Sequence, residues 1–255
     1  MIELGFDTST HATSVALMLD DDEMLRARDD PRPEEHPGHA TRLLAMAGEL
    51  LATAGTSWAS VERIAVGLGP GRFTGLRVGI ATARGLAQSL AAELVGVSSS
   101  LALAKAALET PPGKRHAPRD GRVLIVIDAR RGEVFAGAYR ASGRDAAIEL
   151  VPPRAIVPGQ LAVTIALAEE QGVGSDGWLA VGDGALRYRD QLETAGVTVP
   201  DGSSPLHLVD AGTICEIGRH GRPVTAYEQI LPDYRRRPDA EIALDGVQAG
   251  GGVPS

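Results

Sequence analysis

Apolar and polar residues alternate over the first part of the chain, which is the pattern of short, half-buried strands. The alternation of residues 2–7 ends at Asp7, and a polar turn at residues 8–10 leads into a second apolar stretch at residues 14–19. An acidic turn then precedes a third short stretch at residues 24–28. We therefore predict three consecutive strands, the first of which ends in a carboxylate.

Helical and strand patterns alternate after this start. Apolar side chains first recur at helical spacing in a segment that ends near Gly55 and contains Leu43, Leu44, Met46, Leu50 and Leu51. Residues 64–67 predict a buried strand, and a glycine-rich turn after them opens a helix that runs to about residue 91. Residues 94–97 predict another strand, and residues 98–108 another helix.

The opening pattern then returns in the second half of the chain. An apolar strand at residues 123–127 ends in Asp128, and a turn that closes with a glycine leads to strands at residues 133–139 and around 147–151. Asp128 therefore corresponds to Asp7, and the hairpins follow at similar offsets. We interpret this repetition as a duplicated α/β unit with mixed sheets. The second half continues with helices at 159–171, 185–195 and 210–220, and a strand at 179–181.

These patterns predict two domains and a tail. The first domain is expected at residues 1–106, with residues 210–238 packing back on it, and the second, smaller one at residues 107–209. A loop rich in proline, glycine and basic residues at 111–121 lies near the junction. From residue 239 the chain is too polar and glycine-rich to fold.

The composition agrees with an ordinary globular protein. The chain has 255 residues, of which 44% are hydrophobic, enough for one large domain or two of ordinary size. Its single cysteine, Cys215, cannot form an internal disulfide and falls in a predicted helix, where a buried core thiol is the common case. Neither a secretory leader nor a membrane-spanning run is recognisable, so we expect a soluble, cytoplasmic protein.

The formal net charge of −8 argues against an autonomous nucleic-acid binder, because affinity for phosphate backbones comes mostly from lysine and arginine. Two local basic groups stand out, and we interpret both as solvated loops or partner surfaces rather than RNA sites. They are Lys114, Arg115, Arg119 and Arg122 in the first, and Arg235, Arg236 and Arg237 in the second.

The strongest local feature is the glycine-rich segment at residues 69–79, GPGRFTGLRVG, between a predicted strand and a predicted helix. A helix N-terminus preceded by glycines is able to hold an anion, although the Gly-Lys-Ser/Thr ending of a phosphate-binding loop is absent. Gly75, Gly79 and Ala83 are spaced four apart on one helical face, which permits close helix packing. This second reading predicts a tight internal contact or a subunit interface, and we favour it over phosphate binding.

The same segment resembles the GPGSFTGLRIG motif of the TsaB (YeaZ) family, with Arg72 where that family usually has serine. The opening FDTSTHATSVAL resembles the family's DTST…SVAL start, and His39 before Leu43-Leu44 resembles its His-x-x-x-Leu-Leu helix entry. Three further resembling segments are VSS at 97–99, IDARRGEV at 127–134 and LPDYRR at 231–236. The resemblance covers about residues 1–238 in the same order.

The resemblance implies an actin-like ATPase (sugar kinase/actin-like) fold, built from duplicated ribonuclease-H-like domains. It also implies a non-catalytic subunit that heterodimerises with and activates a TsaD-like transferase, which places threonylcarbamoyl on the adenosine 3′ of the anticodon in tRNAs reading codons that begin with A. A TsaE-like ATPase joins the pair, and tRNA is reached only through the complex. No cofactor of its own and no membrane contact are implied. The resemblance allows ATP at the complex interface and a homodimer when the partner is missing.

The residues expected at the partner interface lie on the two helices of the first domain. They are Leu43, Met46, Leu50, Phe73, Gly75, Leu76, Gly79 and Ala83. Replacement of Gly79 by a bulky residue is accordingly expected to abolish the heterodimer and leave the monomer folded.

The residues after strand 94–97 agree with a non-catalytic role beside an active transferase. The active relative holds its metal there with a His-x-x-x-His pair, whereas residues 98–104 of this chain read SSSLALA. Serine is a poor ligand for transition metals, so neither a metal nor a catalytic residue is expected. His36 and His39 belong to a different element, where a surface or helix-capping role is expected.

The two strand-end acids leave room for weak nucleotide binding. In active actin-like ATPases such acids position magnesium and hairpin hydroxyls touch phosphate, so the residues with possible vestigial contacts are Asp7, Thr8, Ser9, Thr10 and Asp128. The alternative is that both carboxylates cap the N–H groups of their own turns.

Two other functions are alternatives to the accessory-subunit role. The two acids favour a stand-alone actin-like ATPase or kinase. Against it, the glycine motif that contacts adenosine in active members of that fold is reduced here to Gly182-Asp183-Gly184. A glycoprotease-like peptidase has neither a Ser/His/Asp set nor a HExxH motif to support it.

Overall fold

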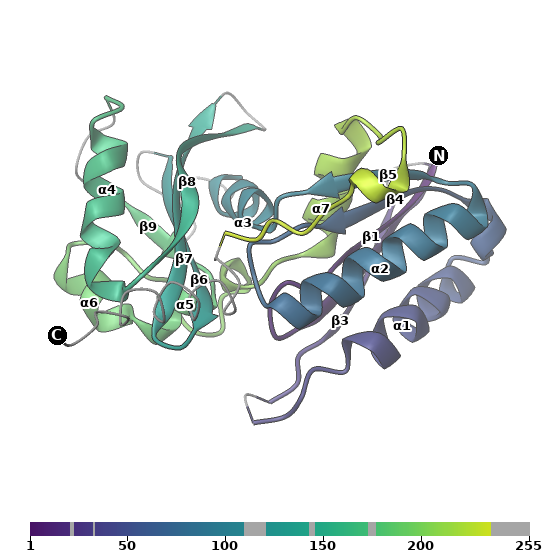
Figure 1. Cartoon of the computed structure of the whole chain (residues 1–255), viewed down its shortest axis with the longest axis horizontal. Helices are drawn as coiled ribbons and strands as arrows, with labels where there is room; N and C mark the ends of the chain where they lie inside the picture. The colour runs from purple at the N-terminus through teal and green to yellow at the C-terminus, as the bar shows by residue number, and fades with distance from the viewer. Residues whose placement is uncertain (21–22, 33, 110–120, 143–145, 173–176, 236–255) are drawn as a thin grey trace, which may run out of the picture.

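The computed structural model describes residues 1–20, 23–32, 34–109, 121–142, 146–172 and 177–235 (Figure 1). Within this part the chain forms two α/β halves, each built on its own sheet. The expected loop at 111–121, apart from Gly121, and the expected unfolded tail from residue 239 lie outside the described residues.

The first half is built on a five-stranded mixed sheet. Its strands are β1 (Ile2–Asp7), β2 (Thr13–Met18), β3 (Met24–Asp29), β4 (Val61–Gly67) and β5 (Glu93–Val97), in the order β3-β2-β1-β4-β5. The first three pair antiparallel, and β4 and β5 add in parallel. All five predicted strands are confirmed: β1 has the predicted bounds, and the bounds of the others differ by no more than three residues.

Helices cover both faces of this sheet, because alternate side chains of its buried strands are apolar on both sides. On one face α1 (His39–Thr53) and α2 (Phe73–Leu90) lie side by side and enclose a core with Leu4 and Phe6 of β1 (Figure 1). On the other face α7 (Ala211–His220) packs on β1 and β2, where the buried thiol of Cys215 meets Ala16. The short 3₁₀ helix Trp58–Ser60 precedes β4.

The second half repeats the first on a smaller scale. Its strands are β6 (Arg122–Arg130), β7 (Glu133–Ser142), β8 (Ala146–Ile156) and β9 (Leu179–Val181), in the order β8-β7-β6-β9. This order matches β3-β2-β1-β4, with two antiparallel pairs followed by a parallel one. The shared order, with an acid near the end of each leading strand, is that of duplicated ribonuclease-H-like units. The predicted actin-like α/β fold is confirmed.

The helices of the second half are short. α4 (Leu161–Glu169) follows a 3₁₀ turn at Pro158–Gln160, and another 3₁₀ turn, Pro205–His207, precedes α7. One helix is predicted at 185–195, but the structure has α5 (Asp183–Arg187) and α6 (Arg189–Thr194) instead. The backbone of Tyr188 between them, at φ −114° and ψ 30°, leaves the helical region and separates the two segments.

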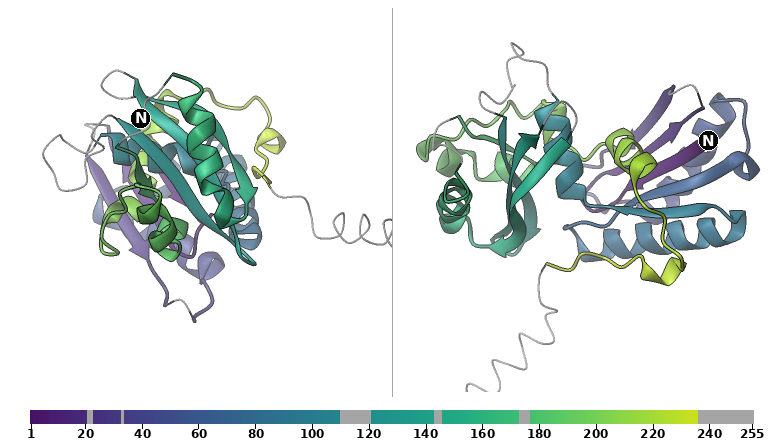
Figure 2. Two further views of the ribbon diagram at one scale, coloured as in Figure 1. Left: turned by 90° about the vertical axis from the view of Figure 1, so that its left-hand side faces the viewer. Right: turned by 90° about the horizontal axis from the view of Figure 1, so that it is seen from above.

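Two features connect the halves. α3 (Ser99–Leu108) packs between the sheets, in a core that joins Val95 and Val97 of β5 to Val123 and Ile125 of β6. After α7 the chain returns along α2 through the 3₁₀ turn Tyr227–Gln229, as the yellow segment in Figure 2 shows. In the part of the chain that the structure describes, no helix is both long and apolar enough to cross a membrane.

Candidate functional site

Asp7 is held by hydrogen bonds from its own turn and from α3. One carboxylate oxygen accepts from the Ser9 backbone N–H at 2.8 Å and from the Ser9 hydroxyl at 2.7 Å. The other accepts from the Ser99 hydroxyl at 2.5 Å. Gly67 lies against the same group, because a Cβ at residue 67 would come within 1.9 Å of it. The carboxylate, only 1% exposed, therefore caps the turn after β1 and ties it to α3.

The turn after Asp7 packs directly on the start of α2. The Thr8 hydroxyl donates to the Gly75 carbonyl at 2.8 Å, and the Ser9 carbonyl accepts from the Arg72 backbone N–H at 2.7 Å. Thr8 and Ser9 are buried, and Thr10 is half-buried. The hydroxyls of Thr8 and Ser9, two of the candidate phosphate contacts, are thus engaged in internal hydrogen bonds.

This packing corrects the expected partner interface. Seven of its eight residues are buried inside the chain, because the apolar stripes of α1 and α2 face the sheet: Leu43, Met46, Leu50, Gly75, Leu76, Gly79 and Ala83. Only Phe73 is exposed, to 51%. A Cβ at Gly75 would lie 2.0 Å from the Thr8 carbonyl oxygen. The helix face that carries Gly75, Gly79 and Ala83 therefore makes a tight contact inside the chain. This is one of the two alternatives, internal contact or subunit interface, that the glycine spacing allows.

Asp128 is held in a comparable way on the second half. One of its oxygens accepts from the Arg130 backbone N–H at 2.9 Å, and the other from the Arg187 guanidinium at 3.0 Å. The Asp128 N–H donates to the Asp183 carboxylate at 2.8 Å. Asp183 is half-buried, and desolvation of its carboxylate raises its pKa. Sequence reasoning missed Asp183 and Arg187, although the turn at 182–184 marked their position.

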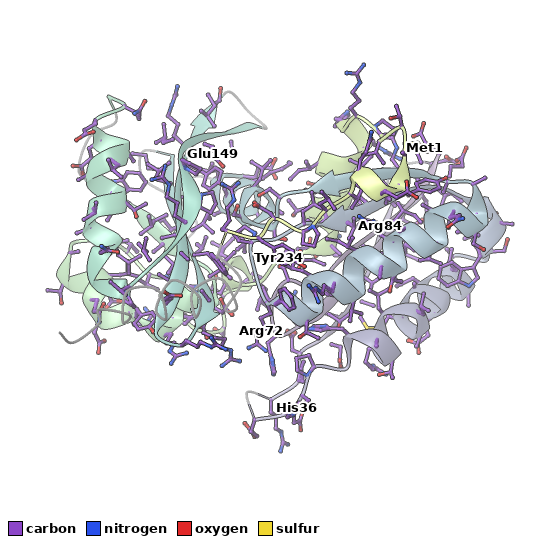
Figure 3. All side chains as sticks on the ribbon, viewed as in Figure 1. Met1, His36, Arg72, Arg84, Glu149 and Tyr234 are labelled. Carbon is purple, nitrogen blue, oxygen red and sulfur yellow. The ribbon has the colours of Figure 1, made fainter. Side chains whose placement is uncertain are left out.

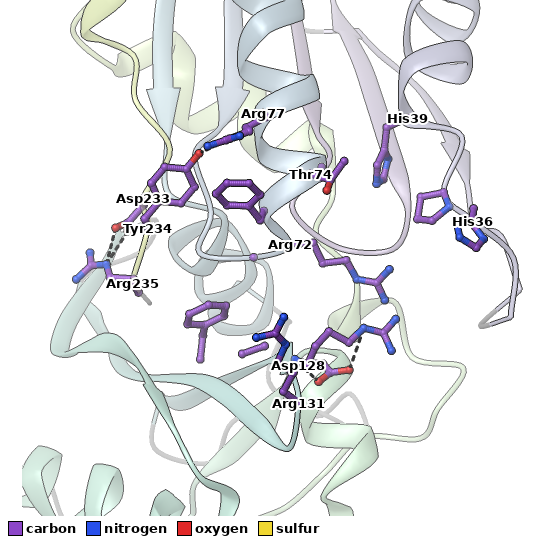
Figure 4. Close-up of a pocket in the computed structure, with 17 residues that line it drawn as sticks. His36, His39, Arg72, Thr74, Arg77, Asp128, Arg131, Asp233, Tyr234 and Arg235 are labelled. Atoms are coloured by element: carbon purple, nitrogen blue, oxygen red, sulfur yellow. Dashed lines mark hydrogen bonds and ion pairs between the residues drawn. The ribbon is translucent and has the colours of Figure 1, made fainter. Parts of the chain in front are cut away.

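A cavity of about 720 Å³ opens between the two halves. The first half contributes the entry to α1, the start of α2 and the C-terminal segment, and the second contributes the turn between β6 and β7 with Phe135. Figure 3 marks this region with Arg72 and Tyr234, and Figure 4 shows the Arg72 side chain extending toward the turn that carries Asp128 and Arg131. The charged side chains of the lining are Arg72, Arg77, Arg130, Arg131, Arg235, Asp128 and Asp233.

Arg72 lies in the middle of this cavity lining. Its guanidinium contacts the ring Nδ1 of His11 at 2.5 Å, and its Nε is buried with no hydrogen-bond partner among the described residues. Burial lowers the pKa of Arg72, and the positive charge of Arg130 lowers it further, whereas the carboxylates of Asp183 and Asp128 raise it in part. Two cations from opposite halves therefore face the same space.

An aromatic pair forms one wall of the cavity. The rings of Phe73 and Tyr234 stack with their centroids 5.3 Å apart, and the Arg77 guanidinium lies 3.7 Å from the Phe73 centroid. Arg77 also donates to the Tyr234 hydroxyl at 3.0 Å. Such stacked and cation–π contacts hold the C-terminal segment against α2. The sequence carries no local signal for this long-range contact.

The histidines and serines singled out in the sequence, His36, His39 and those after β5, lie apart from one another in the described structure. His39 is buried at the start of α1, where its Nδ1 contacts the Thr13 hydroxyl at 2.8 Å and burial lowers its pKa, whereas His36 is exposed. Ser100 is bonded to the Tyr139 hydroxyl at 2.9 Å. Within the described ranges, no three His, Cys, Asp or Glu residues come together as ligands.

Comparisons with known proteins agree with the fold. The family model described as "TsaD: tRNA N6-adenosine threonylcarbamoyltransferase" matches residues 33–169. A protein of Escherichia coli K12 described as "tRNA threonylcarbamoyladenosine biosynthesis protein TsaB" is 32% identical, over 96% of this chain and 99% of its own length. A protein of Haemophilus influenzae with the same description is 31% identical, over 91% and 92%. Among solved structures, YeaZ from Pseudomonas aeruginosa superposes with a TM-score of 0.70 at 29% identity, covering 92% of this chain and all of that one.

Proposed function

The chain belongs to the TsaB (YeaZ) family, and we propose that it is the accessory subunit that pairs with and activates a TsaD-type transferase in tRNA threonylcarbamoyladenosine biosynthesis. The observation that carries this proposal is the likeness to a protein named for that pathway along nearly the whole length of both chains. The match of residues 33–169 to the transferase family model supports a partner of related fold. A TsaE-type ATPase, and ATP where the subunits meet, complete the proposed assembly.

A non-catalytic role is supported by the state of the two strand-end acids. Each carboxylate oxygen of Asp7 accepts a hydrogen bond from the chain itself, and those of Asp128 are held by Arg130 and Arg187. Carboxylates engaged in this way are poorly disposed to coordinate a catalytic magnesium ion. No observation on the described residues favours a stand-alone kinase or a peptidase.

The outward faces of α1 and α2 are the surface that we assign to the partner. Leu44 on α1 is 45% exposed, Phe73 on α2 is 51% exposed, and Leu231 of the C-terminal segment that runs along α2 is 63% exposed. Large exposed apolar side chains of this kind are typical of protein interfaces. These outward residues replace the inward ones as candidates for contact.

A co-purification experiment tests the pairing. The Leu44→Glu variant is expected to lose the TsaD-type partner on a sizing column, because a carboxylate would be buried at the contact. Val163→Glu is the matched control, since Val163 is 54% exposed on α4 of the other half and should keep the partner. Full retention of the partner by Leu44→Glu would remove this surface from the proposal.

A reconstitution tests the role itself. Two reactions are compared, one with this chain and one without it. Both contain the transferase, the TsaE-type ATPase, ATP, a threonine-derived donor and unmodified tRNA, and the modified adenosine is measured by mass spectrometry. We expect product only when the chain is present together with the transferase. Equal modification in its absence, or modification by this chain alone, would overturn the proposed function.

A further inference from the structure

The outer face of α4 is apolar where a surface helix is ordinarily polar. Val163 is 54% exposed and Leu167 is 39% exposed, whereas Thr164, the polar residue beside Val163, is only 6% exposed. The other outward positions of the two turns, Ala162 and Ala166, are also apolar. A helix that is apolar on every side is typical of a helix that is buried on every side. The outward face of α4 therefore has the character of a contact surface.

This face lies far from the surface that we assign to the transferase. In Figure 1, α4 stands at the left-hand end of the molecule, whereas α1 and α2 lie at the right-hand end. The left panel of Figure 2 turns that left-hand end toward the viewer, and α4 there runs across the front of the second half. The two surfaces are therefore separate, and both can be occupied at the same time.

A groove of about 420 Å³ adjoins this face, between the start of α4 and α6. Its apolar lining includes Leu161, Ala162 and Ile165 of α4 and Leu192 of α6. Ala162 belongs both to the groove and to the outward face, so the two form one continuous surface. Ala166 follows Ala162 by one helical turn, and side chains as small as these allow a second helix to approach closely.

Acidic side chains stand at the C-terminal end of α4. Its last residue, Glu169, is followed directly by Glu170, and its last turn contains no basic residue. The negative end of the helix dipole repels carboxylates at this place, so both acids cost stability in the chain alone. Cations supplied by a partner would offset this repulsion.

Further negative charge lies near the start of α4, where Asp190 of α6 lines the groove. Among the described residues Asp190 and the two acids of α4 form no ion pair, whereas Glu193 is held by Arg189 at 3.0 Å. Arg154 on β8 is exposed and offsets at most one of the three free carboxylates. The apolar face is thus flanked by acids at both ends, and it favours a basic partner.

We propose that the outer face of α4 and its groove bind an amphipathic helix of a partner protein, which lays an apolar stripe on Val163 and Leu167 and turns lysine or arginine toward the flanking acids. An apolar groove beside a helix is a common receptor for such helices. The charges disfavour two other occupants. In a symmetric pair with a second copy, the acids of one α4 would face those of the other. An anionic lipid surface would be repelled by the same acids.

Fluorescence anisotropy on the full chain tests this proposal. The probe is a labelled peptide of about 18 residues, long enough to form a helix, with leucine at positions i, i+3, i+4 and i+7 and lysine elsewhere. Its controls are a peptide of the same composition in scrambled order and a peptide with glutamate in place of lysine. We expect only the amphipathic lysine peptide to bind, with an affinity that falls as the salt concentration rises.

Matched variants locate the apolar part of the surface. The double variant Val163→Gln, Leu167→Gln places a good helix former at two exposed positions, so the chain should fold. Loss of the two aliphatic contacts should weaken binding of the lysine peptide by about tenfold or more. Leu208→Gln removes a comparable side chain, 37% exposed, from outside this surface and should bind the peptide like the unmodified chain.

A second pair of variants tests the charges. The double variant Glu169→Gln, Glu170→Gln should weaken binding of the lysine peptide and lessen its dependence on salt. The same change should raise the melting temperature of the chain alone, because it removes the repulsion from the helix dipole. Glu228→Gln, at an exposed position of the first half, is the control and should leave binding and its salt dependence unchanged.

Three results would overturn the proposal. They are the absence of binding, equal binding of the scrambled or glutamate peptide, and unchanged affinity in the folded Val163→Gln, Leu167→Gln variant. Sedimentation equilibrium of the chain alone is measured in parallel. If the chain dimerises and this double variant does not, a second copy occupies the face and the proposal is wrong. Since no transferase or tRNA enters these measurements, their failure would leave the proposed function untouched.

Discussion

The Thr8 hydroxyl occupies the space beside Gly79, so that a Cβ on residue 79 would lie 2.3 Å from the hydroxyl oxygen. Thr8 cannot easily yield, because its hydroxyl donates to the Gly75 carbonyl one helical turn earlier. α2 therefore approaches the turn after β1 more closely than any side chain at residue 79 would allow. The contact also places the start of α2 at the cavity.

Substitution of Gly79 should consequently destabilise the monomer. We expect Gly79→Ala to lower the free energy of unfolding by about 1–3 kcal/mol through overpacking, measured by urea denaturation. Gly85 on the same helix is the control, since nothing lies within 4 Å of a Cβ there. Gly85→Ala should raise the free energy of unfolding by about 0.5–1 kcal/mol through helix propensity. Similar effects of the two changes would refute the packing role of Gly79.

The hydrogen bonds of Asp7 lead to a second prediction. The Asp7 carboxylate accepts three hydrogen bonds from Ser9 and Ser99. Asp7→Asn replaces one of its two acceptor oxygens by an NH₂ donor, so at least one of these bonds is lost, and the change should cost about 1–3 kcal/mol of folding free energy. Ser99→Ala removes a single donor and should cost less. Because the two residues share one bond, the double variant should lose less than the sum of the single losses. Strict additivity in chemical denaturation would contradict the coupling.

Residue patterns predict the elements of this protein better than their long-range contacts. The alternation around Leu4 and Phe6 identifies β1, and the matching positions of Asp7 and Asp128 identify the duplication. The spacing of Gly75 and Gly79 identifies a smooth helix face but not its neighbour, because periodicity defines a face and says nothing of what covers it.

The candidate site was harder to predict for the same reason. Arg72 stands out as a departure from the family motif, yet its approach to Arg130 depends on how two halves of the chain meet. The pairing of Arg187 with Asp128 and the stacking of Tyr234 on Phe73 likewise join distant segments. The break at Tyr188 between α5 and α6 escaped prediction because no proline or glycine marks it.

The C-terminal segment should owe its position largely to Ile230. This side chain is 3% exposed and belongs to the core under α2, and the Arg84 guanidinium donates to its carbonyl. Ile230→Ala should cost about 2–5 kcal/mol of folding free energy, whereas Ile230→Val should cost about 0.5–1.5 kcal/mol.

A neighbouring position provides the control for Ile230. Leu231 is 63% exposed, so Leu231→Ala should change stability by no more than about 0.5 kcal/mol. Amide hydrogen exchange of residues 222–235 should accelerate in Ile230→Ala and stay unchanged in Leu231→Ala. Equal exchange in the two variants would mean that other contacts hold the segment.

Glu3 on β1 is the group most able to make stability depend on pH. It is fully buried, and neither carboxylate oxygen has a hydrogen-bond partner in the described part of the chain. Burial raises the pKa of Glu3 to about 7, although the charges of Arg63 and Arg219 lower it in part. Glu93 also faces this group and raises the pKa, and Cys215 lies close by. The native state therefore binds the Glu3 proton more tightly than the unfolded chain.

From this difference the direction of the pH effect follows. The stability that protonated Glu3 contributes is complete below pH 4.5, its ordinary pKa, and is lost as the pH rises through about 7. The loss approaches about 3 kcal/mol at pH 8, from roughly 1.4 kcal/mol per pKa unit. Glu3→Gln keeps the shape without the charge, so the free energy of unfolding of this variant, relative to the unmodified chain, should increase between pH 5 and 8. Glu49→Gln, at an exposed site on α1, is the control and should show no such increase. If the free energy of unfolding of Glu3→Gln relative to the unmodified chain does not change with pH, the Glu3 carboxylate stays ionised in the folded protein.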